Sequence, residues 1–348
     1  MAHPTLHDWH ELESFRRRHH IDPDRIRRMQ YALYQSHEPV ERALQRLGSK
    51  AQTAASELDL APLQIVARTD SQLDLSTKFV LSTWDAQRIE TVVLCAPSGR
   101  AAVCVSTQVG CRAGCTFCAT ARMGLRRNLT AAEIVEQVLV AARDLARRQR
   151  RLRNVVFMGM GEPLDNEYEL HAALRCLQAE TACRIPPRRL SVSTVGVPAA
   201  MLRLVEQFPG IQLALSLHSA RQEVRQRLIP WARRADLAEL HQALQQISTR
   251  PKTHRHQGPV MIEYIMIAGV TDTDEDASAL ADFLRGLDVH INLIPYNQVP
   301  GIECWQPTDR ARRDEFAKHL RGAGIFTTIR YSMGADIRAA CGQLAQTS

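Results

Sequence analysis

Cys111, Cys115 and Cys118 lie within one short segment of the sequence, in the pattern CxxxCxxC. Thiolate sulfur is a preferred ligand of zinc and of iron–sulfur clusters. A closed structural site uses four protein ligands, whereas three thiolates on one loop can hold three irons of a [4Fe-4S] cluster and leave the fourth iron open. The spacing therefore indicates a cluster whose free iron can bind a small molecule. A partial zinc site or a set of buried thiols is the alternative that the spacing alone leaves open.

The cysteine loop follows the first of a series of apolar, strand-like runs that alternate with helical segments. Thr130 and Glu133, for example, form a capping box ahead of an amphipathic helix. Near-continuous apolar strands separated by helices predict a parallel sheet in an α/β fold. Six or seven such units predict an incomplete barrel of the (β/α)6 type. The runs lie at residues 102–106, 154–158, 190–193, 211–217, 260–266, 289–294 and 326–329.

Polar residues and glycines follow these strands at their carboxyl ends, where the reactive groups of such folds gather. Gly161 would let a ligand approach the backbone, and Glu162 can accept a hydrogen bond from an ammonium or a ribose hydroxyl. Each such residue alone is more often a strand-end bend or a satisfied buried polar group. Together they predict a ligand site, to which the neighbouring strand ends add Ser193, Ser216, Leu217, His218 and Asn297.

Composition and charge indicate a cytoplasmic protein with a polyanionic partner. The 348 residues, 45% of them hydrophobic, can form one large core and a small accessory domain. No signal-like N-terminus and no membrane-length apolar run is present, and the nine cysteines suit a reducing compartment. The net charge of +7 is concentrated in residues 122–153 and 221–255, rich in arginine. Clustered arginine favours RNA, although a solvated helix face explains part of it equally well.

The sequence predicts three parts. Residues 1–80 carry apolar positions at helical spacing and are interpreted as a helical accessory domain that contacts RNA. Residues 81–100 predict a β-hairpin extension that bridges to the rest of the chain, because two short β-prone runs flank the turn at residues 85–87. Residues 101–348 form the predicted barrel and a C-terminal loop that contains Cys341.

Six ordered motifs around the cysteine loop resemble the RlmN/Cfr family of radical S-adenosylmethionine (SAM) RNA methyltransferases. The resemblance covers about residues 88–345, and Phe117 before the third cysteine fits it. It implies a radical-SAM barrel with one [4Fe-4S] cluster per chain, held by the three loop cysteines, and two SAM molecules consumed per methylation. The motifs lie at residues 104–111, 128–130, 159–164, 216–218, 292–297 and 336–344.

The resemblance also implies a mechanism that uses two more cysteines. Cys341 matches the cysteine that takes a methyl group from one SAM, and a 5′-deoxyadenosyl radical from a second SAM then removes hydrogen from that methyl. The carbon radical adds to adenine, and Cys104 matches the cysteine that releases the adduct by forming a disulfide with Cys341. Glu90 corresponds to a proton acceptor of the family, and a solvent-facing hairpin residue is its alternative interpretation.

The resemblance implies that the methylated atom is a ring carbon of adenosine, C2 in the first place and C8 as the alternative. The implied substrate is 23S ribosomal RNA, with transfer RNA as a further candidate. Residues 161–164 are similar to RlmN, whereas residues 332–335 are closer to Cfr. The family implies a monomer that receives electrons from a flavodoxin-type reductant. A hypothesis of another class is a zinc-containing RNA-binding protein in which His218 or Cys104 is the fourth ligand. Cys341 argues against it, because a zinc module needs no terminal acceptor cysteine.

Overall fold

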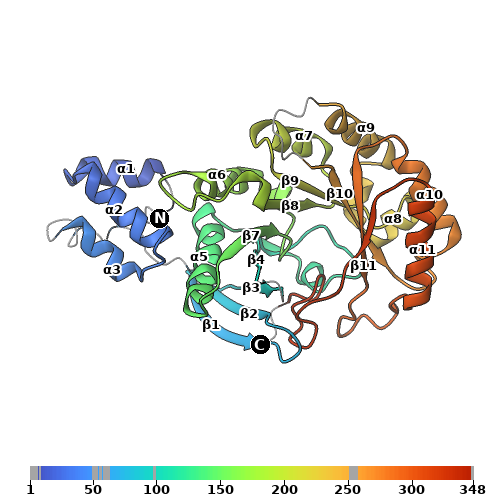
Figure 1. Cartoon of the computed structure of the whole chain (residues 1–348), viewed down its shortest axis with the longest axis horizontal. Helices are drawn as coiled ribbons and strands as arrows, with labels where there is room; N and C mark the ends of the chain where they lie inside the picture. The colour runs from blue at the N-terminus through green and yellow to red at the C-terminus, as the bar shows by residue number, and fades with distance from the viewer. Residues whose placement is uncertain are drawn as a thin grey trace.

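The N-terminal part of the chain is a small group of helices (Figure 1). The computed structural model describes residues 7, 9–48, 54, 57, 63–96, 99–250 and 258–345. Asp22 begins the second helix because its side chain accepts a hydrogen bond from the backbone of the first turn, where Pro23 lies. Ile26, Met29 and Leu33 form the buried face. The group consists of α1 (Trp9–Arg18), α2 (Pro23–Tyr34), α3 (Val40–Leu44) and the 3-10 helix η1 (Gln45–Leu47).

A ten-stranded sheet dominates the rest of the described residues, and its order follows the chain. The first four strands pair antiparallel, and from β4 onward every pairing is parallel. The strands are β1 (Leu63–Asp70), β2 (Thr77–Thr83), β3 (Arg88–Cys95), β4 (Ala101–Cys104), β7 (Leu152–Phe157), β8 (Leu190–Thr194), β9 (Gln212–Ser216), β10 (Val260–Met266), β11 (Val289–Pro295) and β12 (Thr327–Ile329). A separate two-stranded ribbon pairs β5 (Gln108–Gly110) with β6 (Leu125–Asn128).

Helices cover the outer side of the curved parallel sheet (Figure 1). Thr130 and Glu133 form the expected capping box of α5, each side chain bonding to the other residue's backbone. The helices are α5 (Ala131–Arg147), α6 (Glu167–Gln178), α7 (Pro198–Gln207), α8 (Gln222–Leu228), α9 (Leu237–Ser248), α10 (Asp274–Leu284) and α11 (Arg310–Gly322). Short 3-10 helices are η3 (Thr120–Met123), η4 (Pro163–Asn166), η5 (Pro187–Arg189) and η6 (Pro230–Arg233). In the described part of the chain, no helix combines the length and the apolar character that crossing a membrane requires.

The α/β fold with a parallel sheet agrees with the sequence analysis, and so does the hairpin of β2 and β3. The N-terminal helical part is shorter than expected. In the described residues, β1 begins at Leu63, within the range predicted to be helical. The strands β1, β5 and β6 were not predicted. The division of the chain into an accessory domain, a bridge and a barrel remains a prediction.

Candidate active site

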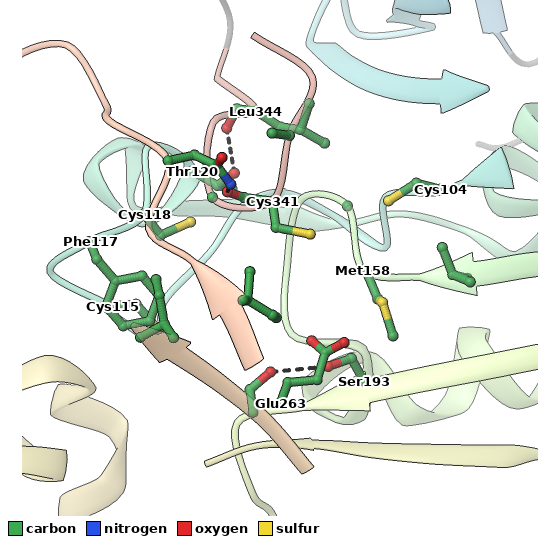
Figure 2. A pocket seen from close by; sticks show the side chains of 18 of the residues that line it. Cys104, Cys115, Phe117, Cys118, Thr120, Met158, Ser193, Glu263, Cys341 and Leu344 are labelled. Carbon is green, nitrogen blue, oxygen red and sulfur yellow. Dashed lines mark hydrogen bonds between the residues drawn. The ribbon is translucent and has the colours of Figure 1, made fainter. Parts of the chain in front are cut away.

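A cavity of about 190 Å³ lies at the carboxyl ends of the parallel strands, between the cysteine loop and the C-terminal segment (Figure 2). Most of the residues predicted from the sequence line it. Leu217 does not, because its side chain is buried in the core and only its backbone faces the β10 strand. Glu90 also lies outside the lining. The predicted residues that do line the cavity are Cys104, Cys111, Cys115, Cys118, Gly161, Glu162, Ser193, Ser216, His218, Asn297 and Cys341.

Backbone hydrogen bonds fix the cysteine loop on both sides. The Cys111 N–H donates to the Gly124 carbonyl over 3.1 Å, which joins the loop to the β5–β6 ribbon. The Thr116 N–H donates to the Leu228 carbonyl over 2.9 Å, so the C-terminal end of α8 holds the other side. Gly110 has a φ of +79°, and a Cβ there would come within 1.8 Å of the Gly124 carbonyl oxygen. A side chain at Gly110 would therefore displace the loop.

The three loop cysteines suit an iron–sulfur cluster. Burial raises the pKa of Cys111 to about 12 and also raises the pKa of Cys115 and Cys118, so the empty loop carries neutral thiols. Thiolates at this position therefore need a bound metal for stabilisation. Within the described ranges, no group of three or more His, Cys, Asp or Glu side chains is arranged around a single metal-ion position. The three cysteines fit a [4Fe-4S] cluster, because such a cluster distributes its thiolates over separate irons.

Replacing Cys115 with alanine should remove most of the iron that the protein retains after anaerobic reconstitution, because two thiolates cannot hold three irons. Iron and sulfide per chain, together with the visible absorbance, measure this. Cys304→Ala is the matched control, since Cys304 is an exposed free cysteine outside the cavity. Equal iron content in Cys115→Ala and the control would remove Cys115 from the ligand set.

Glu162 is held in place by the protein and still borders the cavity. Its Oε2 accepts from the Val195 N–H over 2.8 Å, and its Oε1 accepts from the Leu164 N–H over 3.0 Å. Burial raises the pKa of Glu162 to about 7, and these bonds oppose the shift. Gly161 is required beside it, because a Cβ there would come within 2.6 Å of Gln108. The Thr194 side chain is a further hydrogen-bond partner of Glu162, so the carboxylate fixes the turn while it borders the cavity.

His218 is a neutral and rigid part of the wall. Its φ of +60° turns the chain sharply after β9. Its Nδ1 accepts a hydrogen bond from the Ile265 N–H over 3.2 Å, which leaves the ring proton on Nε2. Burial lowers the pKa of His218 to about 3, and Arg225 acts in the same direction. The ring packs edge-on against Phe117 of the cysteine loop, with centroids 5.0 Å apart.

Two serines and an acidic residue form a further part of the cavity wall. Ser193 and Ser216 lie on adjacent strands, and their hydroxyl oxygens are 3.1 Å apart. Glu263 on β10 is buried beside them (Figure 2), and its Oε1 lies 3.6 Å from Nη1 of Arg330. Glu263 and Arg330 both line the cavity and were not predicted as site residues. The available signal was a lone charge in the otherwise apolar run of residues 260–266.

The C-terminal segment places Cys341 at the cavity opposite Cys104 (Figure 2). The Asn297 amide donates to the Cys341 carbonyl over 3.1 Å, and the Thr120 hydroxyl donates to the Leu344 carbonyl over 2.5 Å. Both cysteines are free thiols. Burial raises the pKa of each, to about 12 for Cys104, and the nearby Arg330 guanidinium opposes both shifts. Arg330 is therefore the cation that favours a thiolate at this site.

Glu90 lies next to the cavity but is sealed from it. It is fully buried on β3, on the same face as Val92, which pairs directly with Cys104. Lys78 Nζ lies 3.2 Å from Glu90 Oε1 and donates to the Arg338 carbonyl over 3.4 Å. The alternative interpretation of Glu90 as a solvent-facing hairpin residue is therefore wrong. Burial raises the pKa of Glu90, and Lys78 opposes this.

Some of the arginines that were predicted to contact RNA form ion pairs within the protein. Arg127 pairs with Asp85 at 2.7 Å and with Glu133 at 2.8 Å. In the second basic stretch, Arg225 is fully buried, and residues 251–257 lie outside the described residues. Fewer cations than the sequence suggested are thus free to contact phosphate groups.

Comparisons with known proteins agree with this geometry. The profile described as "Radical SAM superfamily" matches residues 105–284. A "Probable RNA methyltransferase" of Rhodopirellula baltica is 42% identical over 97% of this chain and 87% of its own length. A "Probable dual-specificity RNA methyltransferase RlmN" of Thermus thermophilus is 42% identical over 84% of this chain and 80% of its own length.

The chain belongs to the RlmN group of radical SAM RNA methyltransferases. The crystal structure of a radical SAM methyltransferase from Sphaerobacter thermophilus shares its fold, with a TM-score of 0.91, 39% identity and coverage of 98% of both chains. Membership of this group implies an enzyme that uses SAM and a [4Fe-4S] cluster on an RNA substrate. The zinc-binding, non-catalytic hypothesis is not supported.

Proposed function

We propose that this RlmN-type enzyme methylates C2 of an adenosine in 23S ribosomal RNA and in transfer RNA, through an S-methylcysteine at Cys341. One observation carries the proposal: the thiols of Cys104 and Cys341 line the same cavity as the three loop cysteines. The S-methylcysteine route needs two further thiols there, one that carries the methyl group and one that releases the product. The RlmN name of the relatives favours C2 over C8, and their description as dual-specificity enzymes favours more than one RNA substrate.

The cofactor-binding residues divide into two sets. Cys111, Cys115 and Cys118 would hold one cluster per chain, which supplies the electron that splits SAM into methionine and a 5′-deoxyadenosyl radical. Two SAM molecules are consumed per methylation, one for each half of the reaction. The SAM-binding set is Gly161, Glu162, Ser193, Ser216, Leu217, His218 and Asn297. Leu217 contributes through its backbone, and the Asn297 side chain also holds the C-terminal segment.

Cys341 is the methyl acceptor of the first half-reaction. Adenine C2 is electron-poor and does not attack a sulfonium, so the methyl group is first transferred to sulfur. The Cys341 thiolate displaces S-adenosylhomocysteine from SAM, and Arg330 stabilises the thiolate. In the second half-reaction, loss of a hydrogen atom from this methyl group gives a carbon radical that bonds to C2.

Cys104 and Glu90 complete the reaction. Glu90 accepts the proton that leaves C2 as the ring regains aromaticity. The unpaired electron of the adduct leaves at the same stage, and the cluster, oxidised when it gave its electron to SAM, would take it back. The Cys104 thiolate attacks the Cys341 sulfur, an S–S bond forms, and the carbon leaves sulfur with the bonding electrons and takes up a proton. Because Glu90 is sealed under the C-terminal segment, RNA binding must shift that segment before the carboxylate can act.

RNA recognition fits the rim of the cavity. Tyr331 precedes the Cys341 segment, lines the cavity and is 79% exposed, so its ring offers a flat surface on which a base can stack. We further propose that residues 1–80 contact RNA, residues 81–100 act as a bridge and residues 101–348 catalyse. We also propose that the protein is a monomer in the cytoplasm and that it receives electrons from a flavodoxin-type reductant.

Mass spectrometry of RNA nucleosides tests the proposed function. The cluster-loaded protein reacts anaerobically with SAM, a reductant, and unmodified ribosomal or transfer RNA. Appearance of 2-methyladenosine in both RNAs is the expected result. Appearance of 8-methyladenosine would place the enzyme with Cfr, and no methylated adenine despite SAM cleavage would contradict the substrate assignment.

Replacing Lys78 with methionine should slow the second half-reaction at neutral pH and leave it nearly intact at high pH. Loss of the lysine charge raises the pKa of Glu90 further, so a larger share of the carboxylate is protonated and cannot accept a proton. Near neutral pH we expect the rate of the second half-reaction to fall about tenfold, which is less than the full contribution of a general base to the rate. The measurement is the pH dependence of a single turnover that starts from protein already methylated on Cys341. Lys78→Arg is the control, and an unchanged profile in Lys78→Met would contradict the role of Glu90.

A further inference from the structure

Arg225 on α8 is a buried cation without an acidic partner. Its side chain is 0% exposed, and in the described part of the chain no Asp or Glu forms an ion pair with it. Its Nη2 donates to the Val195 carbonyl over 2.5 Å, whereas Nε and Nη1 have no hydrogen-bond partner. Burial lowers the pKa of Arg225 to about 10, so the side chain stays protonated at neutral pH. A charged group in this state is costly unless an anion joins it.

The surroundings of Arg225 indicate where that anion binds. Cys115 lies close enough to interact electrostatically with the guanidinium, and so does His218. The residues that follow Arg225 hold the cysteine loop directly, since the Leu228 carbonyl accepts from the Thr116 N–H over 2.9 Å. Arg225 does not line the cavity itself. Its guanidinium is bonded to the backbone of Val195, which does line the cavity, so Arg225 lies just outside the cavity wall and beside the cysteine loop.

A [4Fe-4S] cluster would supply the missing negative charge. An oxidised [4Fe-4S]²⁺ core with three thiolates is an anion, and reduction by one electron adds a further negative charge. A bound cluster is then the largest local charge in the site. A cation near the cluster stabilises the reduced state more than the oxidised state, because the attraction grows with the negative charge of the cluster.

We propose that Arg225 is the buried counter-charge of the cluster, which raises the reduction potential of the cluster and helps to retain it. This inference rests on the cluster of the proposed function. It does not depend on the RNA substrate or on the position that is methylated. Arg225 acts through charge on the cluster and is a positioning residue, with no contact to the reacting carbon atoms.

A redox titration of the reconstituted protein, followed by electron paramagnetic resonance without SAM, tests the proposal. Arg225→Gln keeps an N–H donor for the Val195 carbonyl but removes the charge, and Arg225→Lys keeps the charge. We expect the equilibrium for reduction to fall at least tenfold in Arg225→Gln, which for one electron corresponds to about 59 mV more negative. Arg225→Lys should stay close to the wild type. Arg227→Met is the matched control, since Arg227 is an exposed arginine on the same helix.

Equal potentials in the wild type and Arg225→Gln would overturn the inference. A shift that appears only after SAM is added would also overturn it, because the arginine would then serve the SAM carboxylate. A wild type that takes up no iron would instead contradict the cluster of the proposed function, so the two failures are distinguishable.

Thermal unfolding with and without the cluster separates charge compensation from ordinary packing. Loading the cluster should raise Tm less in Arg225→Gln than in the wild type, because only the wild type gains a partner for a buried charge. Arg225→Lys should regain most of the wild-type gain. A purely structural role would lower Tm by the same amount in the empty and loaded proteins, and that result would overturn the proposal.

Discussion

Cys341→Ala protein is expected to lose RNA methylation by roughly 10⁴-fold or more, since removal of a covalent nucleophile leaves no alternative route to an electron-poor carbon. The cluster loop does not depend on Cys341, so cleavage of SAM to 5′-deoxyadenosine should continue. The loss should come from chemistry and not from misfolding. The segment is held by backbone groups, such as the carbonyls of Cys341 and Leu344, which alanine also provides.

Three measurements on the same protein check this expectation. The intact mass reports methylation of the protein, chromatography reports 5′-deoxyadenosine, and nucleoside mass spectrometry reports methyladenosine. Cys304→Ala, which changes an exposed cysteine outside the cavity, should match the wild type in all three. Methylated adenosine from Cys341→Ala protein would exclude the S-methylcysteine route.

The parallel sheet was predictable from the sequence because its strands are buried on both faces. Leu190–Thr194 is buried at every position, so the strand appears in the sequence as a nearly unbroken β-prone run. Leu63–Asp70 shows the opposite case. Seven of its eight residues are exposed, and it forms a strand through its antiparallel pairing with β2. Local sequence carries no apolar alternation there, and the segment was therefore assigned to the helical part.

The candidate site was predictable where motifs carry the chemistry, and less so where tertiary contacts do. The loop cysteines and Cys341 line one cavity although more than half of the chain separates them. Glu263 and Arg330 come together only because β10, β11 and β12 are neighbours in the sheet. Glu90 was assigned to the site, yet its burial beneath the C-terminal segment could not be predicted without knowing where Arg338 lies.

Arg225 illustrates the same limit in energetic terms. In the sequence it is one of several basic residues in a stretch interpreted as an RNA-binding surface. In the structure it is the largest fully buried side chain, and two of its nitrogens lack partners. The cost of an unpaired buried charge becomes visible only when the packing around it is known.

Cys104→Ala protein should accumulate a covalent complex between Cys341 and RNA. Without the Cys104 thiolate, the carbon–sulfur bond of the adduct has no nucleophile to open it, while the preceding steps at Cys341 are unaffected. Cys104 and Cys341 line one cavity, and every other cysteine in its lining belongs to the cluster loop. Methylated RNA released per turnover should therefore fall at least about 10²-fold, the scale at which loss of one catalytic group is usually felt.

Denaturing gel electrophoresis of the anaerobic reaction with labelled RNA shows the complex directly. Nuclease digestion followed by peptide mass spectrometry locates the linked adenosine on Cys341. The double variant Cys104→Ala, Cys341→Ala is the matched control, and it should form no complex because the attachment site is gone. Free turnover by the Cys104→Ala protein, with no retained RNA, would refute the resolving role of Cys104 and require another nucleophile at the cavity.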